Sequence, residues 1–328
     1  MSSPIILSRT PYRIPLGGGS TDMPSYYREY GGFIFGAAIN LYMDILVKQP
    51  RSDDLIHVHY KSFEAVDDVA AIRHDIARQA LIMNGITDSV AISFKADTPA
   101  GTGLGSSGAC AVGLMKALSL FDGRDLSGLE AAEMSFDLTQ ALGLPDGKQD
   151  PYLCALGDFT ALYIDTDGKV TVSTPAISEE TKKHFWDNSS FFYTGVHRHS
   201  KPILSAQSER RVIEVKHEIR AIGEEVLGAF VNGDLDRFGR LLDRHWQVKR
   251  GMVSGVSNDD FDDIYRAAKS AGALGGKIMG AGGGGYFMFY CPDADSVEQV
   301  RFAMSSLNMR EMIFSVDKQG CRAKVIDI

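Results

Sequence analysis

A segment rich in glycine and serine is the part of this sequence best suited to chemistry. It runs from residue 99 to 108 with the order Pro-Ala-Gly-Thr-Gly-Leu-Gly-Ser-Ser-Gly. Alternating apolar residues at 90–95 predict a strand before it, and small residues from about 107 to 121 predict a helix after it. Glycines let the backbone approach a ligand, and the free N–H groups at a helix start attract phosphate. The segment therefore predicts a phosphate-binding loop, in preference to a tight turn without a ligand.

Two widespread phosphate-binding motifs do not fit. A Walker A loop ends in Gly-Lys-Ser or Gly-Lys-Thr, and this segment has no lysine. The spacing G-x-G-x-x-G occurs at 103–108 and again at 280–285, as in dinucleotide-binding folds. After the first match, however, residues 122–125 lead into a second predicted helix, and after the second a strand follows directly. Both contexts argue against a dinucleotide-binding domain.

Length and composition are ordinary for a soluble globular protein. The 328 residues are enough for two domains or one large one, and they are 44% hydrophobic and 23% charged. The net charge of -8 argues against a nucleic-acid partner, although a local pocket can still bind a small anion. The four cysteines are widely spaced and predict buried free thiols. Since no apolar run can cross a bilayer and no leader-like segment opens the chain, we expect a cytoplasmic enzyme without a membrane partner.

The elements around the loop form two groups. In the first half we expect strands at 5–7, 33–39, 42–48 and 56–60, helices at 69–84 and 127–142, and a hairpin at 159–173. In the second half we expect strands at 191–193 and 286–290, helices at 203–231, 235–248, 261–271 and 296–307, and a closing hairpin at 313–328. The likeliest boundary lies at Thr174–Pro175, which predicts domains at 1–175 and 176–328.

Three motifs in this order resemble the GHMP kinase family, which includes galactokinase, homoserine kinase, mevalonate kinase and phosphomevalonate kinase. They lie at residues 11–22, 99–107 and 277–285. Within the family, segments 17–27, 147–150, 193–198 and 273–277 are most similar to the D-glycero-D-manno-heptose 7-phosphate kinases. The resemblance implies an α/β + α+β fold. An N-terminal domain like ribosomal protein S5 and a ferredoxin-like C-terminal domain would hold ATP and sugar in the cleft between them.

The resemblance implies ATP-dependent phosphorylation of the anomeric hydroxyl of heptose 7-phosphate, in the synthesis of activated heptose for surface polysaccharide. Three alternatives stay open: a kinase for fucose, mannose or unphosphorylated heptose, a non-catalytic sensor of ATP and sugar, and an ATP-dependent decarboxylase. The anomer and the need for the 7-phosphate are not fixed by the sequence. Nor is the oligomeric state, for which a homodimer is one option.

Two residues match the family's catalytic positions. Asp150 would accept or align the proton of the attacking hydroxyl, but it also precedes Pro151 and suits a helix N-cap. Arg13 would stabilise the charge that develops on the transferred phosphoryl group; its alternative is a surface arginine on a strand.

The resemblance also implies ligand contacts. The predicted ATP-binding residues are Pro99, Gly101, Gly103, Leu104, Gly105, Ser106, Ser107 and Gly108. The predicted substrate-binding residues are Gly17, Gly18, Gly19, Ser20, Thr21, Asp22, Gly282 and Gly283, with Asp22 bonding sugar hydroxyls unless it stabilises its own turn. A phosphate on the substrate needs a cationic site, for which Lys148, Arg198 and Lys201 are candidates.

A magnesium ion would accompany ATP, and Ser107 matches the family's magnesium-binding serine. The glutamate that the family places on the helix before Asp150 is missing, so Asp137 is the predicted substitute, with Glu133 one turn earlier. Alternatively, ATP phosphates, Ser107 and water hold the ion. The histidine pairs 57/59 and 197/199 suggest no zinc site.

Overall fold

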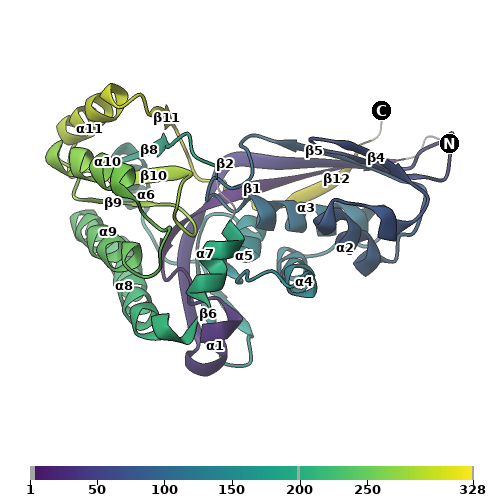
Figure 1. Cartoon of the computed structure of the whole chain (residues 1–328), viewed down its shortest axis with the longest axis horizontal. Coiled ribbons are helices and arrows are strands. Elements are labelled where there is room, and N and C mark those ends of the chain that lie inside the picture. Colours follow the sequence, from purple (N-terminus) through teal and green to yellow (C-terminus); the bar gives the residue numbers. More distant parts are fainter. Residues whose placement is uncertain (1–3, 198–199, 327–328) are drawn as a thin grey trace.

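The computed structural model describes residues 4–197 and 200–326, and in these the strands form two sheets (Figure 1). The first sheet has the order β12-β1-β2-β5-β3-β4, and β6 pairs with both β2 and β7. All its pairs are antiparallel except β3 with β5. Its strands are β1 (Ile5–Gly17), β2 (Gly32–Lys48), β3 (Ile56–His59), β4 (Phe63–Val66), β5 (Val90–Ala96), β6 (Phe159–Ile164), β7 (Val170–Ser173) and β12 (Arg322–Ile326).

Strands β1 and β2 are longer than their sequence predicts. Segments 33–39 and 42–48 join into the single strand β2, and β1 continues past the predicted 5–7 to Gly17. The pairing of the two strands shifts register after Pro11 and again after Pro15. From Thr10 onward every residue of β1 is buried, so Arg13 enters the interior of the molecule instead of lying on the surface.

Helices α2 (Asp75–Asn84), α3 (Ser106–Phe121), α4 (Gly128–Ala141) and α5 (Gln149–Leu156) lie together along the first sheet (Figure 1). Helix α3 is the central one, since it contacts β1, β2 and the other three helices. Its many alanines and glycines let these elements come close. A capping box between Ser127 and Glu130 begins α4. The short helix η1 (Val69–Ala71) precedes α2, and the short helix α1 (Pro24–Tyr30) precedes β2.

The second sheet contains β8 (Ser189–Tyr193), β9 (Gly275–Ile278), β10 (Tyr286–Tyr290) and β11 (Arg310–Met312). Its order is β11-β8-β10-β9, with every pair antiparallel. In chain order this is 4-1-3-2, with helices after the first and third strands, which is the ferredoxin-like arrangement. The expected fold class is thereby confirmed. The helices of this half are α6 (Glu179–Asp187), α7 (Ser200–Gln207), α8 (Ile213–Val231), α9 (Leu235–Arg250), α10 (Asp259–Ser270) and α11 (Ala294–Ser306).

Two predicted elements are wrong. The helix expected at 203–231 is broken by the short turn η2 (Arg210–Val212) between α7 and α8. The expected closing hairpin does not form, because β11 pairs with β8 in the second sheet and β12 pairs with β1 in the first. The division at residue 175 stays a prediction, and the pairing of β12 returns the end of the chain to the first sheet.

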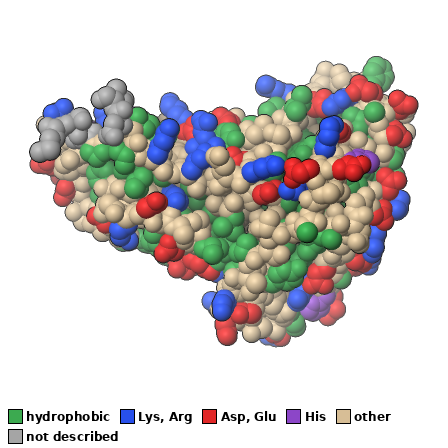
Figure 2. All heavy atoms as spheres, turned by 180° about the vertical axis from the view of Figure 1, so that it is seen from behind, with side chains coloured by type: hydrophobic (Ala, Val, Ile, Leu, Met, Phe, Trp, Pro, Cys, Tyr) green, Lys and Arg blue, Asp and Glu red, His purple; other side chains and the backbone are tan. Residues whose placement is uncertain are grey.

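Burial and surface agree with the composition. All four cysteines are buried and unpaired, as predicted. Acidic and basic side chains are interspersed over the face seen in Figure 2. Among the described residues, no helix is long and apolar enough to cross a membrane.

Candidate active site

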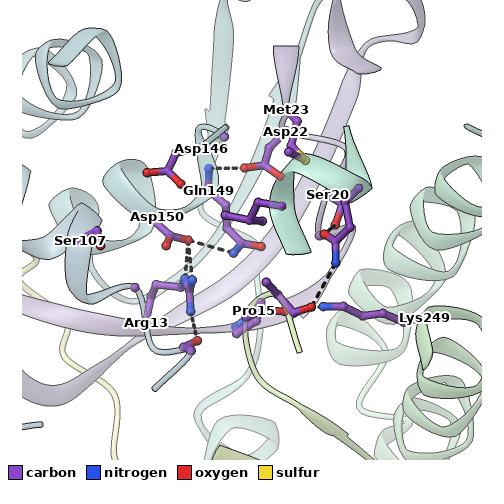
Figure 3. Close-up of a pocket in the computed structure, with 18 of the residues that line it drawn as sticks. Arg13, Pro15, Ser20, Asp22, Met23, Ser107, Asp146, Gln149, Asp150 and Lys249 are labelled. Carbon is purple, nitrogen blue, oxygen red and sulfur yellow. Dashed lines mark hydrogen bonds and ion pairs between the residues drawn. The ribbon is translucent and has the colours of Figure 1, made fainter. Parts of the chain in front are cut away.

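A cavity lies where the first sheet, the glycine-rich loop and the second half of the chain meet. Its walls come from β1 and the turn after it, the loop before α3, the start of α5, helices α7 and α9, and the end of β9 (Figure 3). The lining residues are Arg13, Pro15, Gly19, Ser20, Asp22, Met23, Gly101, Gly103, Gly105, Ser106, Ser107, Asp146, Gly147, Gln149, Asp150, Leu204, Gln207, His245, Lys249, Lys277, Gly280 and Ala281.

An ion pair between Arg13 and Asp150 lies at the centre of this lining (Figure 3). Arg13 Nε and Nη2 donate to Asp150 Oδ1 at 2.8 and 2.5 Å, and Gln149 Nε2 donates to the same oxygen at 3.1 Å. Arg13 Nη1 donates to the carbonyl oxygen of Gly103 at 2.6 Å. Within the described residues Asp150 Oδ2 has no hydrogen-bond partner, so one carboxylate oxygen is held and the other is open to a ligand.

Neither alternative for these two residues fits. Arg13 is 3% exposed and therefore is not a surface arginine. Helix α5 begins at Gln149, so Asp150 lies in its first turn, and the N-cap position belongs to Lys148. A carboxylate in the first turn also interacts favourably with the helix dipole.

The glycine-rich loop joins β5 to α3 and borders the same cavity. Gly101, Gly103 and Gly105 have φ values of 81°, 84° and 80°, which side-chain-bearing residues rarely adopt. Gly105 is the N-cap of α3 and offers no side chain to its first N–H groups. These groups, together with Ser106 and Ser107, can therefore receive an anion at the cavity wall.

Three predicted ATP-binding residues do not line the cavity: Pro99, Leu104 and Gly108. Leu104 is fully buried, and its carbonyl oxygen accepts the Arg13 backbone N–H at 3.0 Å. Gly108 gives Asp150 room, since a Cβ there would lie 2.6 Å from the Asp150 Cβ. Leu104 and Gly108 thus support the ion pair instead of contacting a ligand.

The second glycine-rich segment, residues 280–285, packs against the first. A Cβ on Gly103 would lie 2.4 Å from the Met279 carbonyl oxygen, and one on Gly285 would lie 2.0 Å from the Thr102 carbonyl oxygen. Gly282 and Gly283, predicted to bind substrate, pack against Val256 and do not line the cavity. The segment holds the phosphate loop in place by backbone-to-backbone contact.

The first motif is divided between support and lining. Gly19, Ser20 and Asp22 line the cavity, whereas Gly17, Gly18 and Thr21 do not. Gly17 meets the backbone of Gly223 on α8, and a Cβ on Gly18 would lie 2.0 Å from the Phe33 carbonyl oxygen. The Thr21 hydroxyl lies within hydrogen-bond distance of the Gly18 and Phe33 carbonyl oxygens, at 2.8 Å each.

Asp22 is buried beside Asp150. Its Oδ2 accepts the backbone N–H of Gln149 at 2.8 Å, so it binds the start of α5. Burial raises the pKa of Asp22, and the nearby Asp150 charge raises it further. Gly147 makes the approach feasible, because a Cβ there would lie 2.0 Å from Asp22 Oδ2.

Of the cations predicted for a substrate phosphate, Lys148 and Lys201 do not line the cavity. Lys148 is 4% exposed, lies outside the cavity lining and donates to Glu133 at 2.7 Å. Lys201 is exposed on α7. Arg198 lies outside the described residues. The ion pair with Glu133 neutralises Lys148, so this lysine is not available to a ligand.

The magnesium prediction changes in one residue. Asp137 is exposed on α4 and does not line the cavity, whereas Asp146 lines it together with Ser107. Glu133 is bound by Lys148 and the Tyr152 hydroxyl. Burial and the charges of Asp150 and Asp22 raise the pKa of Asp146 to about 7.

Among the described residues no group of three or more His, Cys, Asp or Glu could hold a metal ion by itself. Magnesium does not require one, since it commonly uses one or two carboxylates with phosphate and water. The Ser107 hydroxyl and the Asp146 carboxylate therefore fit a magnesium ion that arrives with a nucleotide.

Sequence reasoning missed a basic group on the far wall, formed by His245, Lys249 and Lys277. One signal could have found two of them. His245 and Lys249 continue the face of α9 that carries Phe238 and Leu242, at helical spacing. A histidine and a lysine on an apolar face indicate buried polar groups, not solvated ones.

Comparisons with known proteins agree with this geometry. Residues 57–158 match the model for the GHMP kinases N terminal domain, and residues 226–308 match the GHMP kinases C terminal model. The D-glycero-alpha-D-manno-heptose 7-phosphate kinase of Campylobacter jejuni is 26% identical over 97% of this chain and 98% of its own. The L-fucokinase/L-fucose-1-P guanylyltransferase of Bacteroides fragilis is 25% identical over 92% of this chain and 36% of its own.

Among solved structures, a D-glycero-D-manno-heptose 1-phosphate kinase from Bacteroides thetaiotaomicron has a TM-score of 0.81 at 24% identity. The match covers 98% of this chain and 100% of that one. At this identity the likeness shows the shared fold.

Proposed function

Since this chain belongs to the GHMP kinase family, whose sugar kinases transfer a phosphoryl group to an alcohol, we propose that it phosphorylates the anomeric hydroxyl of D-glycero-D-manno-heptose 7-phosphate. ATP is the donor, and the products are ADP and the 1,7-bisphosphate. The observation that carries the proposal is the Arg13–Asp150 ion pair, which lines the same cavity as the glycine-rich loop. The similarity to a heptose 7-phosphate kinase over nearly the full length of both chains favours this sugar.

Asp150 positions the acceptor. Its Oδ1 is fixed by Arg13 and Gln149, so Oδ2 accepts the hydrogen bond of the sugar hydroxyl. As the anomeric oxygen bonds to the γ-phosphorus, the bond from that phosphorus to the bridging oxygen of ADP breaks. The hydroxyl proton passes to Asp150 and then to water.

Arg13 and the loop stabilise the charge on the transferred group. The guanidinium packs against Gly105, since a Cβ there would lie 3.2 Å from Arg13 Nε and 3.3 Å from Arg13 Cζ. The N–H groups at the start of α3 provide further donors that are already oriented before the reaction. Such preorganised electrostatic stabilisation, together with positioning, is the main source of catalysis in phosphoryl transfer. When bound, magnesium held by Ser107 and Asp146 would neutralise charge on the nucleotide phosphates.

The test is a coupled ADP-release assay on mannose, fucose, heptose and heptose 7-phosphate, with the product identified by ³¹P NMR. We expect the highest kcat/KM with heptose 7-phosphate. Asp150→Asn should lower kcat by about 100- to 10,000-fold, while Asp137→Asn, an exposed carboxylate outside the cavity, serves as the matched control. A kinase that prefers fucose would replace the substrate assignment, and full activity of Asp150→Asn would refute the role of Asp150. Carbon dioxide release, or sugar binding without any turnover, would refute the kinase mechanism itself.

A further inference from the structure

Three basic side chains are buried together on the wall of the cavity that belongs to the second half of the chain. His245 and Lys249 lie one turn apart on α9, and Lys277 lies on the neighbouring strand β9. They are 2%, 5% and 2% exposed, and all three line the cavity. Burying cations in this way is costly unless an anion or a set of hydrogen bonds compensates them.

Within the described part of the chain, the protein provides few partners for Lys277 and His245. Lys277 has no ion pair within the described part of the chain, and its amine donates one long hydrogen bond, 3.4 Å, to the Leu16 carbonyl oxygen. Both ring nitrogens of His245 are buried with no hydrogen-bond partner there. Lys249 donates to the Gly280 carbonyl oxygen. The Lys277 amine and the His245 ring can therefore make further hydrogen bonds to a ligand.

The charges also oppose one another. Burial lowers the pKa of Lys277 well below its usual value, and the charges of Lys249 and Arg13 lower it further. Burial likewise lowers the pKa of His245, with Lys277 and Lys249 adding to the effect. An anion entering the cavity would relieve this repulsion and accept hydrogen bonds from the Lys277 amine and the His245 ring.

The position of the group decides which anion. In Figure 3, Ser107 and Lys249 lie on opposite sides of the drawn site, and the Arg13–Asp150 pair lies between them. The nucleotide phosphates belong on the Ser107 side, where the N–H groups of α3 begin. A sugar whose reacting hydroxyl meets Asp150 would extend past Asp22 and Ser20 toward Lys249.

We propose that Lys249, Lys277 and His245 form the subsite for a phosphate carried by the sugar substrate. This rests on the proposed function, and in place of Lys148 and Lys201 it assigns to this group the distinction between a sugar phosphate and a free sugar. The two lysines supply charge, and His245 supplies a donor at the same place.

The test measures binding by the full-length protein with isothermal titration calorimetry, using heptose 7-phosphate, unphosphorylated heptose and ADP. Lys249→Met and Lys277→Met should each weaken heptose 7-phosphate binding about 10- to 100-fold, as expected for one charge-assisted hydrogen bond. ADP affinity should change by less than about threefold. Lys201→Met removes an exposed lysine and is the matched control, with no expected change for either ligand.

A second measurement guards against misfolding. Lys277→Met should raise the melting temperature of the ligand-free protein, because Lys277 is a buried cation with no ion pair in the described part of the chain. Heptose 7-phosphate should stabilise both lysine variants less than it stabilises the wild type. Unchanged heptose 7-phosphate affinity in both folded variants would overturn the subsite. Weakened ADP binding instead would assign the group to the nucleotide. If the wild type neither binds nor phosphorylates heptose 7-phosphate, the proposed substrate fails as well, whereas turnover without sensitivity to the lysines defeats the subsite alone.

Discussion

Replacing Gly103 by alanine tests whether the phosphate loop depends on the glycine-rich segment behind it. Gly103 has a φ of 84°, and a Cβ on it would lie 2.4 Å from the Met279 carbonyl oxygen and 2.9 Å from the Met279 carbonyl carbon. These are backbone atoms and cannot rotate away. To bring the closer contact to 3.0 Å, the two segments must move apart by at least about 0.6 Å.

The magnitude has two parts that a control separates. The left-handed backbone costs an alanine about 1 kcal/mol, and the clash adds roughly 1–3 kcal/mol, as for other overpacked sites. Gly123→Ala has nearly the same φ, 80°, but no atom lies within 4 Å of its Cβ. Gly123→Ala should therefore lose about 1 kcal/mol of unfolding free energy, and Gly103→Ala about 2–4 kcal/mol.

The assay combines denaturant unfolding of the full-length variants with calorimetric binding of a non-hydrolysable ATP analogue. We expect Gly103→Ala to bind the analogue about tenfold or more weakly, because its loop N–H groups are displaced. Gly123→Ala, which is not part of the cavity lining, should bind it as the wild type does. Equal unfolding free energies and equal affinities for the two variants would refute the contact between the segments.

Further predictions concern the carboxylates of the cavity. Asp146→Asn should raise the magnesium concentration for half-maximal ADP release by about tenfold or more, whereas Asp137→Asn should not; an equal response would return the metal to Asp137. The pKa of Asp146 is raised from 3.8 to about 7. The folded protein therefore loses stability as the pH rises from 3.8 to about 7, because ionising this carboxyl group is less favourable in the folded state than in the unfolded chain. The melting temperature of Asp146→Asn should accordingly exceed that of the wild type at pH 8, which corresponds to a gain of about 1 kcal/mol in the free energy of unfolding. This gain should shrink toward pH 5, and a gain independent of pH would contradict the prediction. Asp150→Ala should unfold about 1–3 kcal/mol more easily than Asp150→Asn in urea, because Arg13 loses its acceptor, and equal midpoints would show that the pair contributes nothing to stability.

The sequence was most informative where chemistry restricts residue type. The glycines at 101, 103 and 105 have backbone angles that other residues rarely adopt, so the sequence alone could predict a tightly turning loop there. Arg13 and Asp150 belong to motifs that the family resemblance carried over, and the structure brings them within hydrogen-bond distance. The strand order of the second sheet followed from the same resemblance.

The sequence was least informative where tertiary packing decides. Lysines are usually solvated, so Lys277 and Lys249 gave no sign of burial beyond their apolar neighbours. Glycines in segment 280–285 indicated a close approach, but not whether to a ligand or to another loop. Distance along a helix predicts Asp137 as the magnesium ligand, but the orientation of α4 exposes its side chain to solvent.

The pairing of β12 with β1 has a consequence for synthesis in the cell. Arg9 of β1 pairs with Arg322 of β12, so one edge of β1 stays unpaired until β12 has been synthesised, roughly 300 residues later. At ribosomal speed that delay is about 15–60 seconds, during which the open edge can recruit a strand from another nascent chain. Chaperone protection of newly made chains, and aggregation of those that stop before β12, are the expected marks of this arrangement.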